Sequence, residues 1–113
     1  MAYGFNDDKS KAQVLTAGNL KRKTLNLSYN SSTRVEAGEI VEFAINVSNE
    51  IDLDKVIGIV GVKHNATNRN MILTGLTMSP ELSIFYIDLM NMFTNATSNI
   101  LGNILVTVIY IDQ

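Results

Sequence analysis

Short runs of apolar residues separated by polar turns fill the chain from about residue 24 onward. The clearest pattern lies in residues 40–48, where apolar side chains occupy every second position: Val41, Phe43, Ile45 and Val47. An alternation with a period of two is typical of a strand that places one face on a core and the other in solvent. Residues 40–48 are therefore predicted to form a half-buried strand.

Five further segments are rich enough in branched and aliphatic residues to be predicted as strands: residues 24–29, 55–63, 71–78, 82–91 and 104–111. Turn-forming residues separate them, and Pro80 falls between two strands, where its missing N–H breaks no ladder. Residues 93–103 fit either a polar loop or a loop with one helical turn. The sequence therefore predicts an all-β domain of about six strands, either an antiparallel β-sandwich or a jelly-roll-like fold.

The first 23 residues differ from the rest because they are polar and lack a sustained alternation. Two structures fit them: a short helix over residues 9–17, capped by Asp8 and ended by Gly18, or an extended arm. We therefore divide the chain into an N-terminal arm or docking segment, residues 1–23, and a β-sandwich domain, residues 24–113.

Three of the predicted strands are apolar on both faces. In residues 55–63, a face with Val60 and Val62 opposes a face with Ile57 and Ile59, and residues 82–91 and 104–111 show the same property. A sandwich covers only one face of each sheet, so the second apolar face needs another cover. Loops or the N-terminal arm offer one explanation, and a subunit interface offers the other.

We favour the interface, because few residues lie outside the predicted strands and most of them are polar. The predicted oligomer interface consists of Ile57, Ile59, Phe85, Ile87, Leu105, Ile109 and Ile111. Gly58, Gly61 and Gly75 also interrupt predicted strands. A glycine at such a position marks either the close approach of another backbone or a β-bulge, and the sequence is compatible with both.

Composition narrows the class of protein. A hydrophobic content of 46% and a charged content of 18% are ordinary for a folded domain. The net charge of −2 argues against a general nucleic-acid binder, and the longest apolar runs are too short for a membrane-spanning helix. The chain has no cysteine, so disulfides and thiolate metal sites are excluded.

The sequence contains no candidate catalytic site. His64 is the only histidine, and a solvated loop position is the expected one. Asp52 and Asp54 have the spacing of loop calcium ligands but lack the rest of an EF-hand, so an inter-strand loop is favoured. The basic run at residues 21–23 is expected to be solvated. We therefore predict no enzyme activity, no catalytic residue, no metal and no cofactor.

Aromatic residues offer one alternative to a purely structural role. Tyr3, Phe5 and Tyr29, if exposed, would be able to stack on a sugar, as aromatic residues do in carbohydrate-binding modules. Most aromatic residues of a small domain belong to its core or to an interface, and that explanation is favoured.

The opening residues carry a family resemblance. Residues 3–11, Tyr-Gly-Phe-Asn-Asp-Asp-Lys-Ser-Lys, resemble the start of small structural proteins encoded by phages and prophages of Firmicutes, in which a shared head precedes divergent β-rich bodies. The resemblance implies a virion protein whose head docks on a common partner while the body projects or trimerises. The docking segment is then Tyr3, Gly4, Phe5, Asn6, Asp7, Asp8 and Lys9.

The function expected from these observations is that of a phage virion structural protein, assembled in the host bacterial cytoplasm. Capsid decoration, a head fibre and a tail or baseplate accessory all fit. The expected partners are other copies of the chain, with a homotrimer implied by the resemblance, and other virion proteins. Two alternatives are a receptor- or carbohydrate-binding head at a fibre tip, which recognises a host cell-surface glycan, and a phage-encoded protein that interacts with a host factor.

Overall fold

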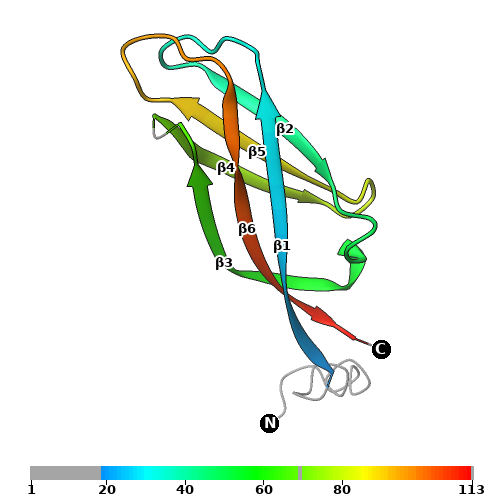
Figure 1. The fold of residues 1–113 in the computed structure, drawn as a ribbon. Helices are drawn as coiled ribbons and strands as arrows, with labels where there is room; N and C mark the ends of the chain where they lie inside the picture. Colours follow the sequence, from blue (N-terminus) through cyan, green and yellow to red (C-terminus); the bar gives the residue numbers. More distant parts are fainter. Residues whose placement is uncertain (1–18, 69, 113) are drawn as a thin grey trace, which may run out of the picture.

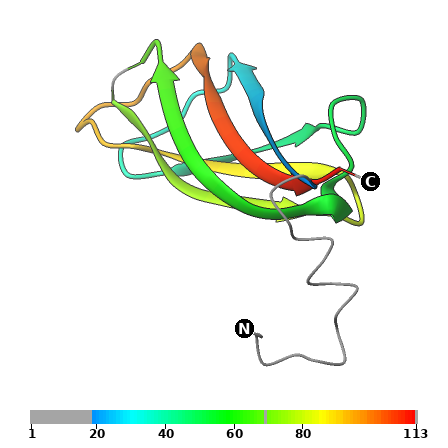
Figure 2. The same cartoon turned by 90° about the horizontal axis from the view of Figure 1, so that it is seen from below.

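The computed structural model describes residues 19–68 and 70–112. These residues form β1 (Leu20–Ser31), β2 (Ile40–Asn46), the short 3-10 helix η2 (Leu53–Lys55), β3 (Val56–Ala66), β4 (Met71–Ser79), β5 (Ile84–Asn91) and β6 (Ile100–Ile111). The strands make two antiparallel three-stranded sheets, ordered β1-β6-β3 and β2-β5-β4. The sheets stack as two layers with their strands oblique to one another (Figures 1 and 2). The predicted antiparallel β-sandwich is confirmed.

Each observed strand coincides with a predicted one, although several extend further. β1 begins at Leu20, so the basic residues 21–23 pair with β6 and belong to the sheet instead of the arm. β3 continues through His64 to Ala66. Residues 92–99 form a loop without a helical turn, after which β6 begins at Ile100. The predicted N-terminal helix or arm over residues 9–17 lies outside the described residues.

The core fills the space between the two sheets. Its buried side chains come from alternate positions of β1, β5 and β6: Leu25, Leu27, Tyr29, Phe85, Ile87, Leu89, Ile104, Val106 and Val108. On β2 the predicted inward face is confirmed, since Val41, Phe43 and Ile45 pack against this cluster and Val47 is buried in it. Each fully buried aliphatic or aromatic side chain contributes roughly 1.5–3 kcal/mol to folding.

Phe85 and Ile87 were expected at an oligomer interface, and that assignment is wrong. Both side chains have no exposed surface and lie on the inner face of β5. β5 is the middle strand of its sheet, and its inner face is covered by the opposite layer. The outward residues of β5, Ile84 and Tyr86, are half-buried because strands flank them on both sides.

Three β-bulges interrupt the edge strands β3 and β4. The register shifts fall between Val56 and Gly58, between Ile59 and Gly61, and between Leu73 and Gly75. Each shift ends at a glycine, so the bulge explanation kept for these glycines is the observed one. The bulges also overturn a predicted opposition: Ile59 pairs with Val108 and Val62 with Val106, which places both on the inward side of the sheet.

The two ends of the sandwich contain different parts of the chain. β1 begins and β6 ends at one end, where the N–H of Asp112 donates to the carbonyl of Asn19 at 2.9 Å. The connections β1–β2, β3–β4 and β5–β6 gather at the opposite end (Figure 1). We call this second region the loop end.

Candidate functional site

Exposed apolar residues concentrate on the edge strand β3. Four of its side chains are at least two-fifths exposed: Ile57 at 49%, Ile59 at 41%, Val60 at 53% and Val62 at 46%. These four residues define the β3 surface. Ile59 and Val62 point toward the same side as buried residues of β6, yet the opposite sheet does not cover them. The sandwich is therefore open at its β3–β4 edge.

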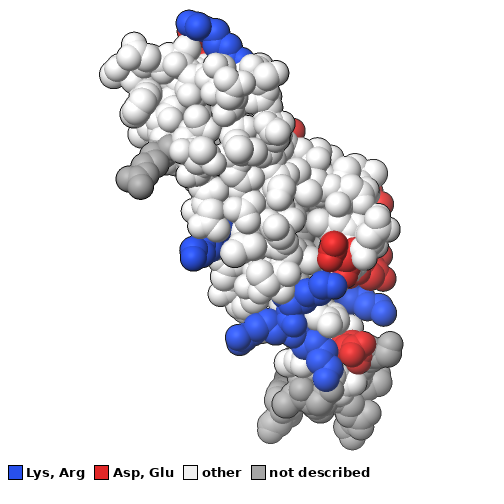
Figure 3. Space-filling view, viewed as in Figure 1, with Lys and Arg blue, Asp and Glu red and all other residues white. Residues whose placement is uncertain are grey.

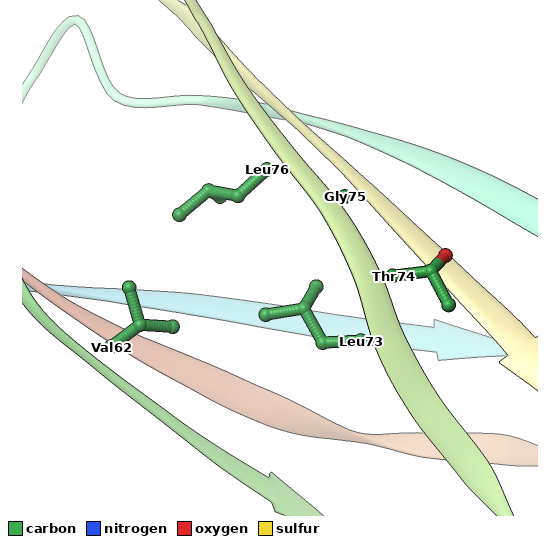
Figure 4. A pocket seen from close by; sticks show the side chains of 5 residues that line it. All are labelled: Val62, Leu73, Thr74, Gly75 and Leu76. Atoms are coloured by element: carbon green, nitrogen blue, oxygen red, sulfur yellow. The ribbon is translucent and has the colours of Figure 1, made fainter.

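This opening forms an apolar groove of about 270 Å³ between β3 and β4. Val62 from β3 and Leu73 and Leu76 from β4 point into one shared space, while Thr74 lies on the other side of β4 (Figure 4). Gly75 completes the lining. The groove offers apolar contact and almost no hydrogen-bonding groups, which suits an apolar side chain from a partner better than a polar ligand.

The outer face of the sheet β1-β6-β3 is nearly uncharged. Figure 3 shows most of the lysine and arginine gathered with carboxylates toward the end where β1 begins, further basic groups at the opposite end and at one side, and a broad uncharged region between the two ends. Leu105, Ile109 and Ile111, all predicted at the interface, lie half-buried on this face of β6. On the same face, the hydroxyl oxygens of Thr24 and Thr107 lie 3.0 Å apart and share a hydrogen bond. These β6 residues are thus less exposed than the β3 surface beside them.

His64 lies in β3 and not in a solvated loop as expected. Its Nε2 is 2.7 Å from the hydroxyl oxygen of Tyr29, and burial lowers the pKa of the imidazole. The tautomer of the ring decides which of the two groups donates this hydrogen bond. Tyr29 itself is buried, with its ring tilted against that of Phe43, so it is not available to stack on a sugar. The pair joins β1 to β3 across β6.

Asn91 organises the loop end, and sequence reasoning missed it. Its side chain is fully buried and uses four hydrogen bonds. Nδ2 donates to the carbonyls of Val35 at 3.1 Å and Asn95 at 2.9 Å. Oδ1 accepts from Nδ2 of Asn70 and from the N–H of Phe93, both at 2.9 Å. One side chain thereby fixes three connections.

A polar residue at an inward strand position was the available signal for Asn91. Inward residues of β5 recur at every second position, Phe85, Ile87 and Leu89, and Asn91 is the next in that series. Buried amides are almost always hydrogen-bonded, so an asparagine in a core series predicts an ordered polar network.

The acidic residues form a structural cap. Asp52 Oδ1 accepts the N–H of Asp54 at 3.0 Å and so caps η2, whose Leu53 is buried. The part of the chain that the structure describes contains no group of three histidine or carboxylate side chains arranged to hold a metal ion. It also contains no helix long and apolar enough to cross a membrane. Lys23 bonds the carbonyl of Glu50, which ties the basic run to the adjacent loop.

The predicted docking segment, residues 3–9, lies outside the described residues, as do Tyr3 and Phe5 as candidate sugar-stacking residues. Of the predicted interface residues, Ile57 and Ile59 are both exposed on β3, with Ile59 on the inward side of the sheet, whereas Leu105, Ile109 and Ile111 lie on the outer face of β6. In comparisons with known proteins, no family model, no curated protein and no solved structure matches the chain.

Proposed function

We propose that the chain is a non-enzymatic structural protein of a phage virion and that it assembles with copies of itself through the β3 surface. The observation that supports this role is the exposure of Ile59 and Val62, 41% and 46%, on the inward side of an open sandwich edge. Contiguous exposed apolar residues of this kind mark an interaction site. The resemblance of residues 3–11 to phage structural proteins supports the virion context.

In this proposal, side chains make the contact between copies, and the edge strands do not pair through backbone hydrogen bonds. Bulges next to Gly58 and Gly61 break the regular edge of β3, and bulged edges resist pairing with another strand. Gly58 pairs with Ile109, so the outer face of β6 begins beside β3, on the side opposite to Ile59 and Val62. Closed rotational symmetry then buries equivalent surfaces on every copy, and the resemblance to phage structural proteins favours a trimer.

Residues 3–9 attach the assembled β domain to another virion protein in this proposal. Self-association and attachment are therefore separate properties. The first depends on the β3 surface, and the second depends on the docking segment.

Self-association is tested by light scattering on the whole chain and on the double variant Ile59→Ser, Val62→Ser. We expect the unmodified chain to have the molar mass of an oligomer at micromolar concentration and the double variant to have that of a monomer. Leu82→Ser is the matched control, because Leu82 is 56% exposed in the turn between β4 and β5 and is not part of the β3 surface. A monomeric unmodified chain, or a double variant that stays oligomeric, would contradict the assembly.

The virion role is tested by mass spectrometry of purified particles of the encoding phage. The chain should be present, and deletion of residues 3–9 should remove it from particles without changing its molar mass in solution. Absence of the chain from particles would exclude the virion role while leaving self-association intact.

A further inference from the structure

Two large apolar side chains are held exposed at the loop end. Met92 is 55% and Phe93 59% exposed, although both follow the fully buried Asn91. The N–H of Met92 donates to the carbonyl of Asn70 at 2.8 Å, and that of Phe93 donates to Oδ1 of Asn91 at 2.9 Å. Their backbone is therefore anchored, so these side chains cannot escape water by a simple shift of the loop.

The same loop is fastened at its other end. Val35 and Thr97 exchange two backbone hydrogen bonds of 2.7 and 2.9 Å, which form an isolated antiparallel bridge. The N–H of Leu101 also donates to Oδ1 of Asn68 at 3.2 Å. A loop fixed at both ends and in its middle presents a preorganised surface, which lowers the entropy lost on binding.

The surface around Phe93 is polar but uncharged. Residues 92–103 contain no charged side chain. Their exposed members include neutral hydrogen-bonding groups: Thr94, Asn95, Ser98 and Asn99. Nearby, Arg34 is paired with Glu36 at 2.6 Å, and Glu39 accepts the N–H of Glu36. An anionic ligand would therefore find the guanidinium of Arg34 already paired with a carboxylate.

We propose that the loop end binds a neutral saccharide. The ring of Phe93 covers the C–H face of a sugar, and the side chains of Asn95 and Thr94 bond its hydroxyl groups. An apolar protein surface fits less well, because it would leave these amide and hydroxyl groups without partners on burial. A sugar supplies both an apolar face and neutral hydroxyls, which matches one exposed aromatic ring among neutral polar groups. This activity is additional to self-assembly and uses a different surface.

The test is an NMR titration of the isotope-labelled whole chain. The probes are neutral oligosaccharides of glucose, galactose and N-acetylglucosamine, with sialyllactose as the anionic comparison. At least one neutral probe should shift the amide signals of residues 92–99 without shifting those of β3. Phe93→Ala should weaken that binding about tenfold, whereas Phe93→Tyr should retain it. Because Phe93 is exposed, neither substitution should disturb the fold.

Three results would overturn the saccharide site. The first is that no neutral probe shifts these signals at millimolar concentration. The second is that the shifts are unchanged in Phe93→Ala or are stronger with sialyllactose. The third is that the signals of residues 92–99 move with protein concentration alone, which would assign the loop end to contact between copies. The variant Ile59→Ser, Val62→Ser should bind the sugar normally, which separates this site from the β3 surface.

Discussion

The hydroxyl oxygen of Tyr29 in β1 lies 2.7 Å from Nε2 of His64 in β3, although β6 runs between the two strands. Gly102 of β6 makes this contact possible. A Cβ atom at Gly102 would lie 2.5 Å from the Tyr29 hydroxyl and 2.6 Å from the carbonyl oxygen of Asn65. The tyrosine side chain therefore crosses the sheet over a position that has no side chain.

Acid should destabilise the fold through His64. Burial lowers its pKa in the folded chain below the ordinary value of 6.5. As pH falls below that value, the unfolded chain takes up the proton first, so the free energy of unfolding decreases until the folded-state pKa is passed. Above the ordinary value of 6.5, the contribution of the neutral imidazole to stability is fully present. Urea unfolding at about pH 7.5 and about pH 5 should show a larger loss for the unmodified chain than for His64→Gln. Equal losses would show that His64 does not titrate with folding.

Replacement of Gly102 by alanine should lower the free energy of unfolding by about 1–3 kcal/mol, because a buried methyl group has to displace Tyr29 or the backbone of β3. Gly58→Ala is the matched control in the same sheet. A Cβ at Gly58 meets no atom within 4 Å, so its effect should stay within about 0.5 kcal/mol. Chemical unfolding measures both. Similar losses in the two variants would argue that the Tyr29 crossing imposes no constraint on Gly102.

The strands of this chain were predictable because each is a short apolar run bounded by turn-forming residues, with a clear alternation in residues 40–48. Val41, Phe43 and Ile45 were predicted on one face and pack against the core. What local pattern does not contain is the position of a strand in its sheet. Phe85 was assigned to an interface because both faces of β5 are mostly apolar, whereas the structure covers its inner face with the opposite sheet. On the edge strand β3, by contrast, Ile59 and Val62 remain exposed.

The candidate sites were harder to predict because they depend on contacts between distant segments. The bulge between Ile59 and Gly61 shifts the alternation of β3, which brings Ile59 to the side of Val62. Strict alternation would place these two residues on opposite faces of the strand. Likewise, the partner of His64 lies 35 residues away, and the two residues become neighbours only when β6 aligns β1 with β3.

Asn91→Asp should be strongly destabilising although it changes a single group. The substitution replaces the Nδ2 donor, which bonds the carbonyls of Val35 and Asn95, with an acceptor and introduces a charge at a fully buried position. We expect a loss of at least about 3 kcal/mol in the free energy of unfolding. Asn30→Asp, at an exposed position of β1, is the control and should have little effect. If the two variants unfold at the same urea concentration, Asn91 does not organise the loop end.

Two phenylalanines distinguish the core from the exposed surface. Phe85 has no exposed area and contacts the core from β5, so Phe85→Ala leaves a cavity and should cost about 3–5 kcal/mol. Phe93 is 59% exposed, and Phe93→Ala should change stability by less than about 0.5 kcal/mol. Urea unfolding of both variants gives the comparison.

Light scattering on the same samples separates a core role for Phe85 from an interface role. Replacement of an interface residue by alanine weakens association between copies. The resulting loss of stability then depends on protein concentration, because dissociation obeys mass action. A core residue destabilises each subunit by the same amount at every concentration. The urea-unfolding transition of Phe85→Ala should therefore show the full loss of stability even at protein concentrations where the chain is most associated. A deficit that disappears at high concentration would return Phe85 to the interface, and the open edge at Ile59 and Val62 would no longer be the principal contact between copies.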